Sequence, residues 1–181
     1  MSDSESTPPP PPPSTPMNNP FEGLDVDKIK NAGLPTKLML GGSIAFFIFA
    51  FFDWWSAEVK VSSEILGSRS TSSSANAFDL GQGTIAWILM IAVGVLAVLM
   101  LLKGANRNFV LAALICSGLG VLFTLWFSAR LPSESDFGFG GVGAGVSVDV
   151  GAGFGLYLSL IAAIVATAGA FLTFQASQQT S

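Results

Sequence analysis

Four long runs of apolar residues restrict the fold of this chain more than any other feature. They cover residues 38–55, 84–102, 109–127 and 154–174, and Asp53 is the one charged side chain inside them. Each run approaches the ~20 residues that an α-helix needs to cross a ~30 Å hydrocarbon core. A soluble helix of this length would carry a polar face. The pattern therefore predicts an all-α membrane protein built as a bundle of four transmembrane helices.

The composition excludes several classes of function. Half of the 181 residues are hydrophobic and only 11% are charged, whereas soluble domains carry about 25% charged residues. Histidine is absent and Cys116 is the single cysteine, which excludes His/Cys metal sites, Ser-His-Asp and Cys-His catalysis, and intrachain disulfides. We expect no enzyme, no catalytic residues, no cofactor and no metal. With 8 basic residues and a net charge of −4, we also expect no nucleic-acid partner.

The N-terminal segment differs sharply from the apolar runs. Nine of the ten prolines lie in the first 35 residues. Residues 1–19 have nothing to bury, which predicts a disordered cytoplasmic tail. Its proline run is a candidate ligand for a cytosolic polyproline-binding partner, and a solvated spacer is the alternative. This run consists of Pro8, Pro9, Pro10, Pro11, Pro12 and Pro13.

Residues 20–36 are predicted to form a short juxtamembrane helix or linker, with Asn19 as its N-cap. A transmembrane domain over 37–175 and a short cytoplasmic tail over 176–181 follow. Basic residues favour the cytoplasmic side of a membrane. Five of them flank one end of the predicted bundle and three flank the other, which places both termini in the cytoplasm of a multi-pass plasma-membrane protein. The five are Lys28, Lys30, Lys37, Lys103 and Arg107, and the three are Lys60, Arg69 and Arg130.

The two predicted outer loops, 56–83 and 128–153, leave two interpretations open. Val59 and Val61 in the first loop, and the valines of 146–150 in the second, alternate with polar residues. This period favours short strands that pair above the membrane, whereas the Gly and Ser content favours flexible loops. Asp79 and Asp149 are expected to cap the helices that follow these loops.

An internal repeat is visible in the ends of the predicted helices. Trp54-Trp55-Ser56 recurs as Trp126-Phe127-Ser128, and Asp79-Leu80-Gly81-Gln82-Gly83 recurs as Asp149-Val150-Gly151-Ala152-Gly153. The recurrence favours two tandem helical hairpins related by an axis along the membrane normal, although common helix-end preferences would also produce such residues.

Two further groups of residues are candidate functional features. Aromatic side chains at one side of the bundle predict an outer interfacial belt, with a platform for a partner as the alternative. This belt comprises Trp54, Trp55, Trp87, Trp126 and Tyr157. Small residues on the last helix predict a helix-packing face, used either within the bundle or in a homo-oligomer. This face comprises Ser159, Ala162, Ala163, Ala166, Gly169 and Ala170.

By its layout, the chain resembles the small, mostly uncharacterised four-helix integral membrane proteins of actinobacteria. The shared features are a Pro-rich tail, Trp at the outer end of the first helix and a Gly-rich start to the last helix. The resemblance implies a bacterial plasma membrane and no particular activity. We therefore expect a non-enzymatic protein in the lipid bilayer that acts as a scaffold or regulatory partner in the cell envelope. A subunit of an oligomeric transporter or channel is the alternative.

Overall fold

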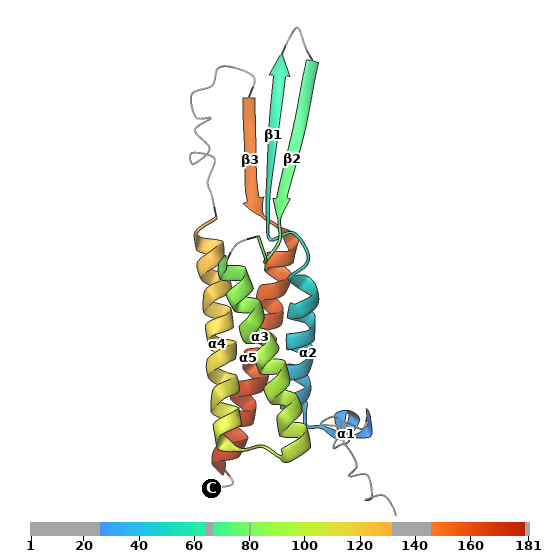
Figure 1. The fold of residues 1–181 in the computed structure, drawn as a ribbon, viewed down its shortest axis with the longest axis vertical. Coiled ribbons are helices and arrows are strands. Elements are labelled where there is room, and N and C mark those ends of the chain that lie inside the picture. Colours follow the sequence, from blue (N-terminus) through green and yellow to red (C-terminus); the bar gives the residue numbers. More distant parts are fainter. Residues whose placement is uncertain (1–25, 64–66, 80, 132–145, 180–181) are drawn as a thin grey trace, which may run out of the picture.

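The computed structural model describes residues 26–63, 67–79, 81–131 and 146–179. Four long helices form an up-down-up-down bundle, and a three-stranded sheet extends beyond one end of it (Figure 1). The helices are α1 (Val26–Asn31), α2 (Leu34–Phe49), α3 (Gly81–Lys103), α4 (Arg107–Ala129) and α5 (Phe154–Gln179). The strands are β1 (Trp55–Ser63), β2 (Gly67–Ala75) and β3 (Val146–Ala152).

Three helices confirm the membrane-length prediction, and the first predicted span is shorter than expected. By length and composition α3, α4 and α5 are long and apolar enough to cross a membrane, whereas α2 has 16 residues. The predicted span 38–55 was wrong at its end: α2 begins at Leu34 and ends at Phe49. The backbone N–H of Trp54 instead donates to the carbonyl of Ala75 at 2.8 Å, because the chain has already entered the sheet. The sheet also makes the all-α prediction wrong.

The structure describes some of the remaining predicted segments and not others. Helix α5 continues through residues 176–179, where a tail was predicted. Pro35 lies in the first turn of α2, where its missing N–H and fixed φ are tolerated. The Pro-rich run and the predicted N-cap at Asn19 lie outside the described residues.

The four long helices contact one another in the cyclic order α2, α3, α4, α5. Their shared interior is filled largely by small side chains, and larger ones point outward. The buried set includes Ala86, Ala97, Ala113, Ala163, Ala166 and Ala170. The exposed set includes Ile44, Ile88, Ile115, Leu122, Ile161 and Ile164, each at least half exposed.

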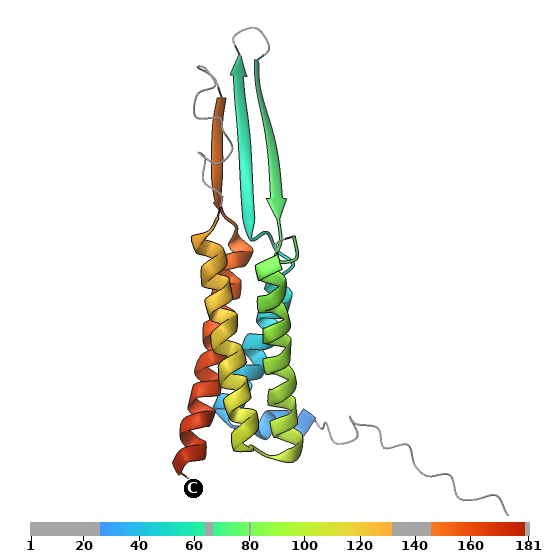
Figure 2. The ribbon, with the colours of Figure 1, turned by 60° about the vertical axis from the view of Figure 1, so that its left-hand side comes forward.

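Strand β1 is the centre of the sheet, whose order is β2-β1-β3 with both pairs antiparallel. The pairing of β1 with β3 confirms the strand hypothesis for the outer loops. Strand β2 was not expected: residues 68–74 appeared in the sequence as a Ser-rich stretch. Figure 2 shows the sheet continuing the long axis of the bundle and not folding back onto its side.

The internal repeat stays a prediction, and the structure shows that its two halves differ in local conformation. The cyclic order gives α2 and α4 equivalent positions, as two tandem hairpins require. However, Trp55-Ser56 begins a strand, whereas Trp126-Phe127-Ser128 belongs to the last turns of α4. Two helix ends with the same residue pattern therefore have different conformations.

Candidate interaction surfaces

One face of the sheet is apolar over β1 and β3, while β2 adds polar residues to it. Directly paired residues of an antiparallel sheet lie on the same face. Val59 pairs with Val148 and Thr71, and Val61 pairs with Val146 and Arg69. Ala57, two residues before Val59, pairs with Val150 and continues this face toward the bundle. We call the set Val59, Val61, Val148 and Val150 the valine face.

The opposite face of the sheet is polar. Glu58 and Lys60 lie there, and their side chains form an ion pair at 3.2 Å. Asp149 lies directly across from Glu58, and both lie on this face with Ser70, Ser72 and Ser74 of β2. Asp149 was predicted to cap a helix, and that prediction was wrong because Asp149 lies within β3. The sheet thus presents two chemically distinct surfaces.

No described helix covers the valine face. The sheet lies beyond the end of the bundle, and its strands contact mainly one another (Figures 1 and 2). Val61 is 43% exposed, and Val59, Val148 and Val150 are half-buried. Contiguous apolar surface that stays partly exposed is typical of protein interaction sites.

Trp54 connects all three strands to the bundle. Its backbone N–H donates to the carbonyl of Ala75 at the end of β2. Its backbone carbonyl accepts from the N–H of Gly153, directly after β3, at 2.9 Å. Its ring is fully buried, with centroid distances of 6.0 Å to Phe46 of α2 and 5.3 Å to Phe127 of α4. Trp54 was predicted in the aromatic belt, and that prediction was wrong because the side chain reaches no surface.

The other predicted belt residues have mixed positions. Trp126 and Tyr157 are exposed by 53% and 56%, and Arg130 stacks over the ring of Trp126 at 4.9 Å. Trp55 begins β1 and is half-buried, as is Trp87 of α3. Trp126 and Tyr157 thus have the exposure that an interfacial belt requires, and the belt itself stays a prediction.

The repeated glycine motifs have a steric explanation. A Cβ on Gly83 would collide with the backbone of Ala77, and one on Gly153 would collide with the carbonyl of Asp53. The preceding glycines of both motifs, Gly81 and Gly151, have open space around them. The last glycine of each motif therefore permits close backbone approach.

The carboxylate of Asp79 accepts a hydrogen bond from the backbone N–H of Asn76, in the turn before α3, at 2.8 Å.

The small-residue face of α5 packs against α2. A Cβ on Gly42 would lie 2.6 Å from the backbone N of Ala166 and 2.7 Å from the carbonyl of Ala162. Further along, Gly169 approaches Pro35 and Met39 just as closely. Ser159, Ala163 and Ala170 are fully buried as well. The small-residue face is thus buried within the bundle and is not accessible to a second copy of the chain.

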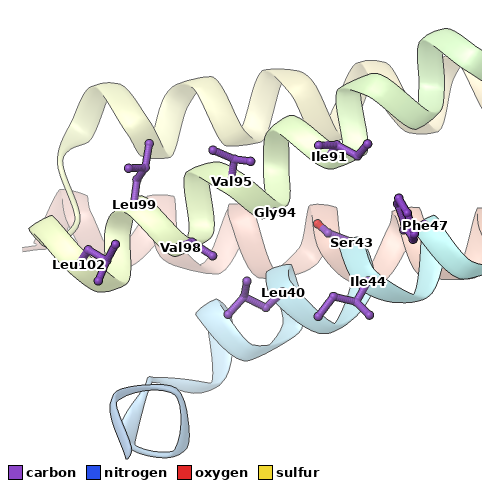
Figure 3. A pocket seen from close by; sticks show the side chains of 10 residues that line it. All are labelled: Leu40, Ser43, Ile44, Phe47, Ile91, Gly94, Val95, Val98, Leu99 and Leu102. Carbon is purple, nitrogen blue, oxygen red and sulfur yellow. The ribbon is translucent and has the colours of Figure 1, made fainter. Parts of the chain in front are cut away.

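Between α2 and α3 the packing is open, and an apolar groove of about 540 Å³ results (Figure 3). Leu40, Ile44 and Phe47 line it from α2, and α3 forms the opposite wall. The α3 wall consists of Ile91, Gly94, Val95, Val98, Leu99 and Leu102. No residue pattern in the sequence marks this groove, because it depends on how the helices are spaced.

Polar atoms inside the bundle are few. The hydroxyls of Ser117 and Thr124 donate to carbonyls of their own helix at 3.1 and 2.8 Å. Those of Ser43 and Ser159 are buried without a hydrogen-bond partner among the described residues. Cys116 is half-buried on α4. In the described ranges, no three His, Cys, Asp or Glu side chains gather as metal ligands.

Comparison with known proteins adds no family to this picture: neither a family model nor a curated protein matches the chain.

Proposed function

We propose that this chain is a non-enzymatic integral protein of the plasma membrane, whose bundle anchors the sheet as a docking module for another envelope protein. The role is that of a scaffold or regulatory partner. The observation that carries the proposal is the valine face, which no described helix covers. Resemblance in layout to four-helix proteins of actinobacteria is consistent with it.

The distribution of side chains supports a location of the bundle in a membrane. Large apolar residues such as Ile115 and Leu122 are about 60% exposed, while the interior holds alanines. In water this arrangement would expose large apolar patches. In lipid it is favourable, since small residues allow helix backbones to approach and the large ones contact acyl chains.

The contacts of α2 support a fourth span. Gly169 of α5 approaches Pro35, and Gly155 of α5 approaches Phe52. The segment from α2 to Phe52 thus follows α5 over 14 residues, or roughly 21 Å at the α-helical rise. A segment that accompanies a membrane-length helix so far shares most of its depth in the bilayer.

Charge supports the orientation. We call the end of the bundle at the α3–α4 connection the basic end; Lys37, Lys103 and Arg107 lie there. Lys28 and Lys30 of α1 adjoin it, so this end has five basic residues among those described, whereas the sheet end has three, Lys60, Arg69 and Arg130. The basic end is therefore assigned to the cytoplasm and the sheet to the outside.

Thiol labelling of intact cells tests this topology. With Cys116 replaced by alanine, Ser72→Cys on β2 and Ala105→Cys in the α3–α4 connection provide matched exposed positions. A membrane-impermeant maleimide should label S72C in intact cells and A105C only after permeabilisation. The reverse pattern contradicts the orientation, and equal labelling contradicts a spanning bundle.

A photocrosslinker on each face tests the docking role. At Val61 the probe should give one discrete crosslinked product in native membranes, and at Lys60, the adjacent residue on the polar face, it should not. Val61 and Lys60 are comparably placed on β1, so exposure alone does not separate them. Equal products from both, or none from Val61, would remove the valine face as the docking surface.

The tail keeps its predicted role as a second contact point. The full chain and a chain lacking residues 1–19 can be crosslinked and purified from native membranes. A cytosolic protein recovered only with the full chain would support a polyproline-binding partner, and identical recoveries would leave the spacer. The transporter alternative is less favoured, because no charged side chain lies in the described interior to mark a transport path.

A further inference from the structure

The groove between α2 and α3 continues to the basic end of the bundle. A second cavity of about 470 Å³ shares Leu40, Ile44 and Val98 with the first, and Lys37 lines it. The combined groove is therefore lined by apolar side chains apart from Ser43, and it has an ammonium group at its mouth.

The groove exists because α2 packs against α5 and not evenly against both neighbours. Gly42 and the small residues of α5 bring these two backbones together. Toward α3, the close contact is between Ser43 and Gly94, where an added Cβ would lie 3.3 Å from that of Ser43. On both sides of this contact, branched side chains line the walls, as Figure 3 shows for Ile44 and Val98. The opening is thus a consequence of the sequence.

The dimensions of the groove match one leaflet of a bilayer. From Lys37 to Phe47 the helical rise gives roughly 15 Å. Half of a ~30 Å hydrocarbon core is also about 15 Å. At the far end, Phe47 stacks on Trp87 with a centroid distance of 5.4 Å and closes the groove. An occupant must therefore enter from the leaflet at the basic end or from the side.

The charge at the mouth favours an anion. Lys37 is exposed and donates one hydrogen bond to the carbonyl of Lys30 at 2.7 Å. An ammonium has three donors, which leaves capacity for a phosphate oxygen. Lys103 and Arg107 lie at the same end of the bundle. Among the described residues Asp27 is the acid there, and it pairs with Lys30 at 3.9 Å.

We propose that this groove binds one acyl chain of an anionic phospholipid from the leaflet at the basic end, and that Lys37 holds the lipid phosphate. The inference rests on the proposed function, since it requires the bundle to span the membrane. Lys37 sets the preference for negative charge, and the apolar walls hold the chain.

Native mass spectrometry of the full chain tests the charge preference. The protein is reconstituted in vesicles of equal phosphatidylglycerol and phosphatidylcholine and then extracted in mild detergent. We expect one retained lipid, with phosphatidylglycerol favoured about fivefold, the effect of one basic residue at the membrane surface. Lys37→Gln should abolish the preference. Lys103→Gln, at the same end but outside both cavities, should keep it.

Filling the groove tests the acyl chain. Val98→Phe places a ring where the two cavities meet and should abolish lipid retention. Ile115→Phe, on an exposed position of α4, is the control and should retain the lipid. No preference in the wild type, retention by V98F, or equal losses in K37Q and K103Q would overturn the proposal.

Two further outcomes are distinguishable in the same samples. A wild-type dimer that V98F converts to a monomer would assign the groove to a second copy and overturn the lipid proposal. Resistance of the protein to alkaline extraction from vesicles reports membrane integration separately. A chain that fails this step contradicts the proposed function, whereas an integrated chain without lipid preference contradicts only the groove. Because Lys37 is exposed, K37Q should fold even if V98F does not.

Discussion

Helix α2 packs closely against α5 on one side and loosely against α3 on the other. Toward α5 the helix presents Gly42, whose missing side chain allows backbone contact with Ala162 and Ala166. Toward α3 it presents Leu40, Ile44 and other side chains that line a groove. Both sides are apolar, so hydrophobicity alone does not decide between them. In lipid there is little hydrophobic driving force between helices, and the size of residues at the contact determines how close they come.

The largest expected effect comes from closing the space at Gly42. In Gly42→Leu the new Cβ meets the backbone of Ala166, which cannot move aside as a flexible side chain can. We expect a loss of more than about 3 kcal/mol in the free energy of unfolding, measured by SDS titration followed with tryptophan fluorescence.

The neighbouring glycine provides the matched control. Gly41 has no atom within 4 Å of its added Cβ. The free energy of unfolding of Gly41→Leu should therefore lie within about 1 kcal/mol of the wild-type value. Similar losses in both variants would mean that the two sides of α2 do not differ in closeness.

Phe46 and Phe47 extend the comparison of the two sides of α2 to larger side chains. Phe46 is fully buried and contacts Trp54, whereas Phe47 is 42% exposed and lines the groove. Phe46→Ala should lower the free energy of unfolding by about 3 kcal/mol, because it leaves a cavity beneath the residue that holds the sheet. For Phe47→Ala we expect about 1 kcal/mol, the loss of its stack on Trp87.

A second readout separates the two phenylalanines. The near-UV circular dichroism of the aromatic cluster should change strongly in F46A, since the environment of Trp54 is rebuilt. If F47A were the more damaging substitution, the groove side of α2 would be the packed one.

Sequence patterns predicted what depends on composition and period. The length of α3, α4 and α5 follows from their unbroken apolar runs, and the strands β1 and β3 follow from alternating valines. Strand β2 was missed because its serines have weak strand propensity. It pairs with β1 along its whole length, from Trp55 opposite Ala75 to Ser63 opposite Gly67.

Features that depend on three-dimensional spacing were not predictable from the chain. Trp54 looked like a belt residue, since aromatic side chains near the end of an apolar run usually lie at the interface. Its burial results from the end of α2 at Phe49, which the apolar run does not signal. Likewise, Gly41 and Gly42 are equivalent in the sequence, and only the position of α5 distinguishes them.

Ser43 lies where the two sides of α2 meet, and its substitution should have a smaller effect of opposite sign. Its hydroxyl is buried without a hydrogen-bond partner among the described residues. A buried hydroxyl without a partner is unfavourable, so Ser43→Ala should raise the free energy of unfolding by up to about 1 kcal/mol. Thr124→Ala is the contrast, because its hydroxyl donates to Gly120 and its loss should be destabilising. A destabilising S43A would show that the hydroxyl has a partner outside the described residues, such as an ester of the proposed lipid.

The smallest expected effect tests whether the open side of α2 is also open in the proposed membrane environment. Gly41→Ala adds one methyl group to free space and improves helix propensity, so it should raise the free energy of unfolding by about 0.5–1 kcal/mol. Gly118→Ala on α4 has equally open surroundings and should behave alike. A loss in G41A with a gain in G118A would mean that a protein surface covers the groove side of α2, because fluid acyl chains yield to a methyl group and a packed helix does not.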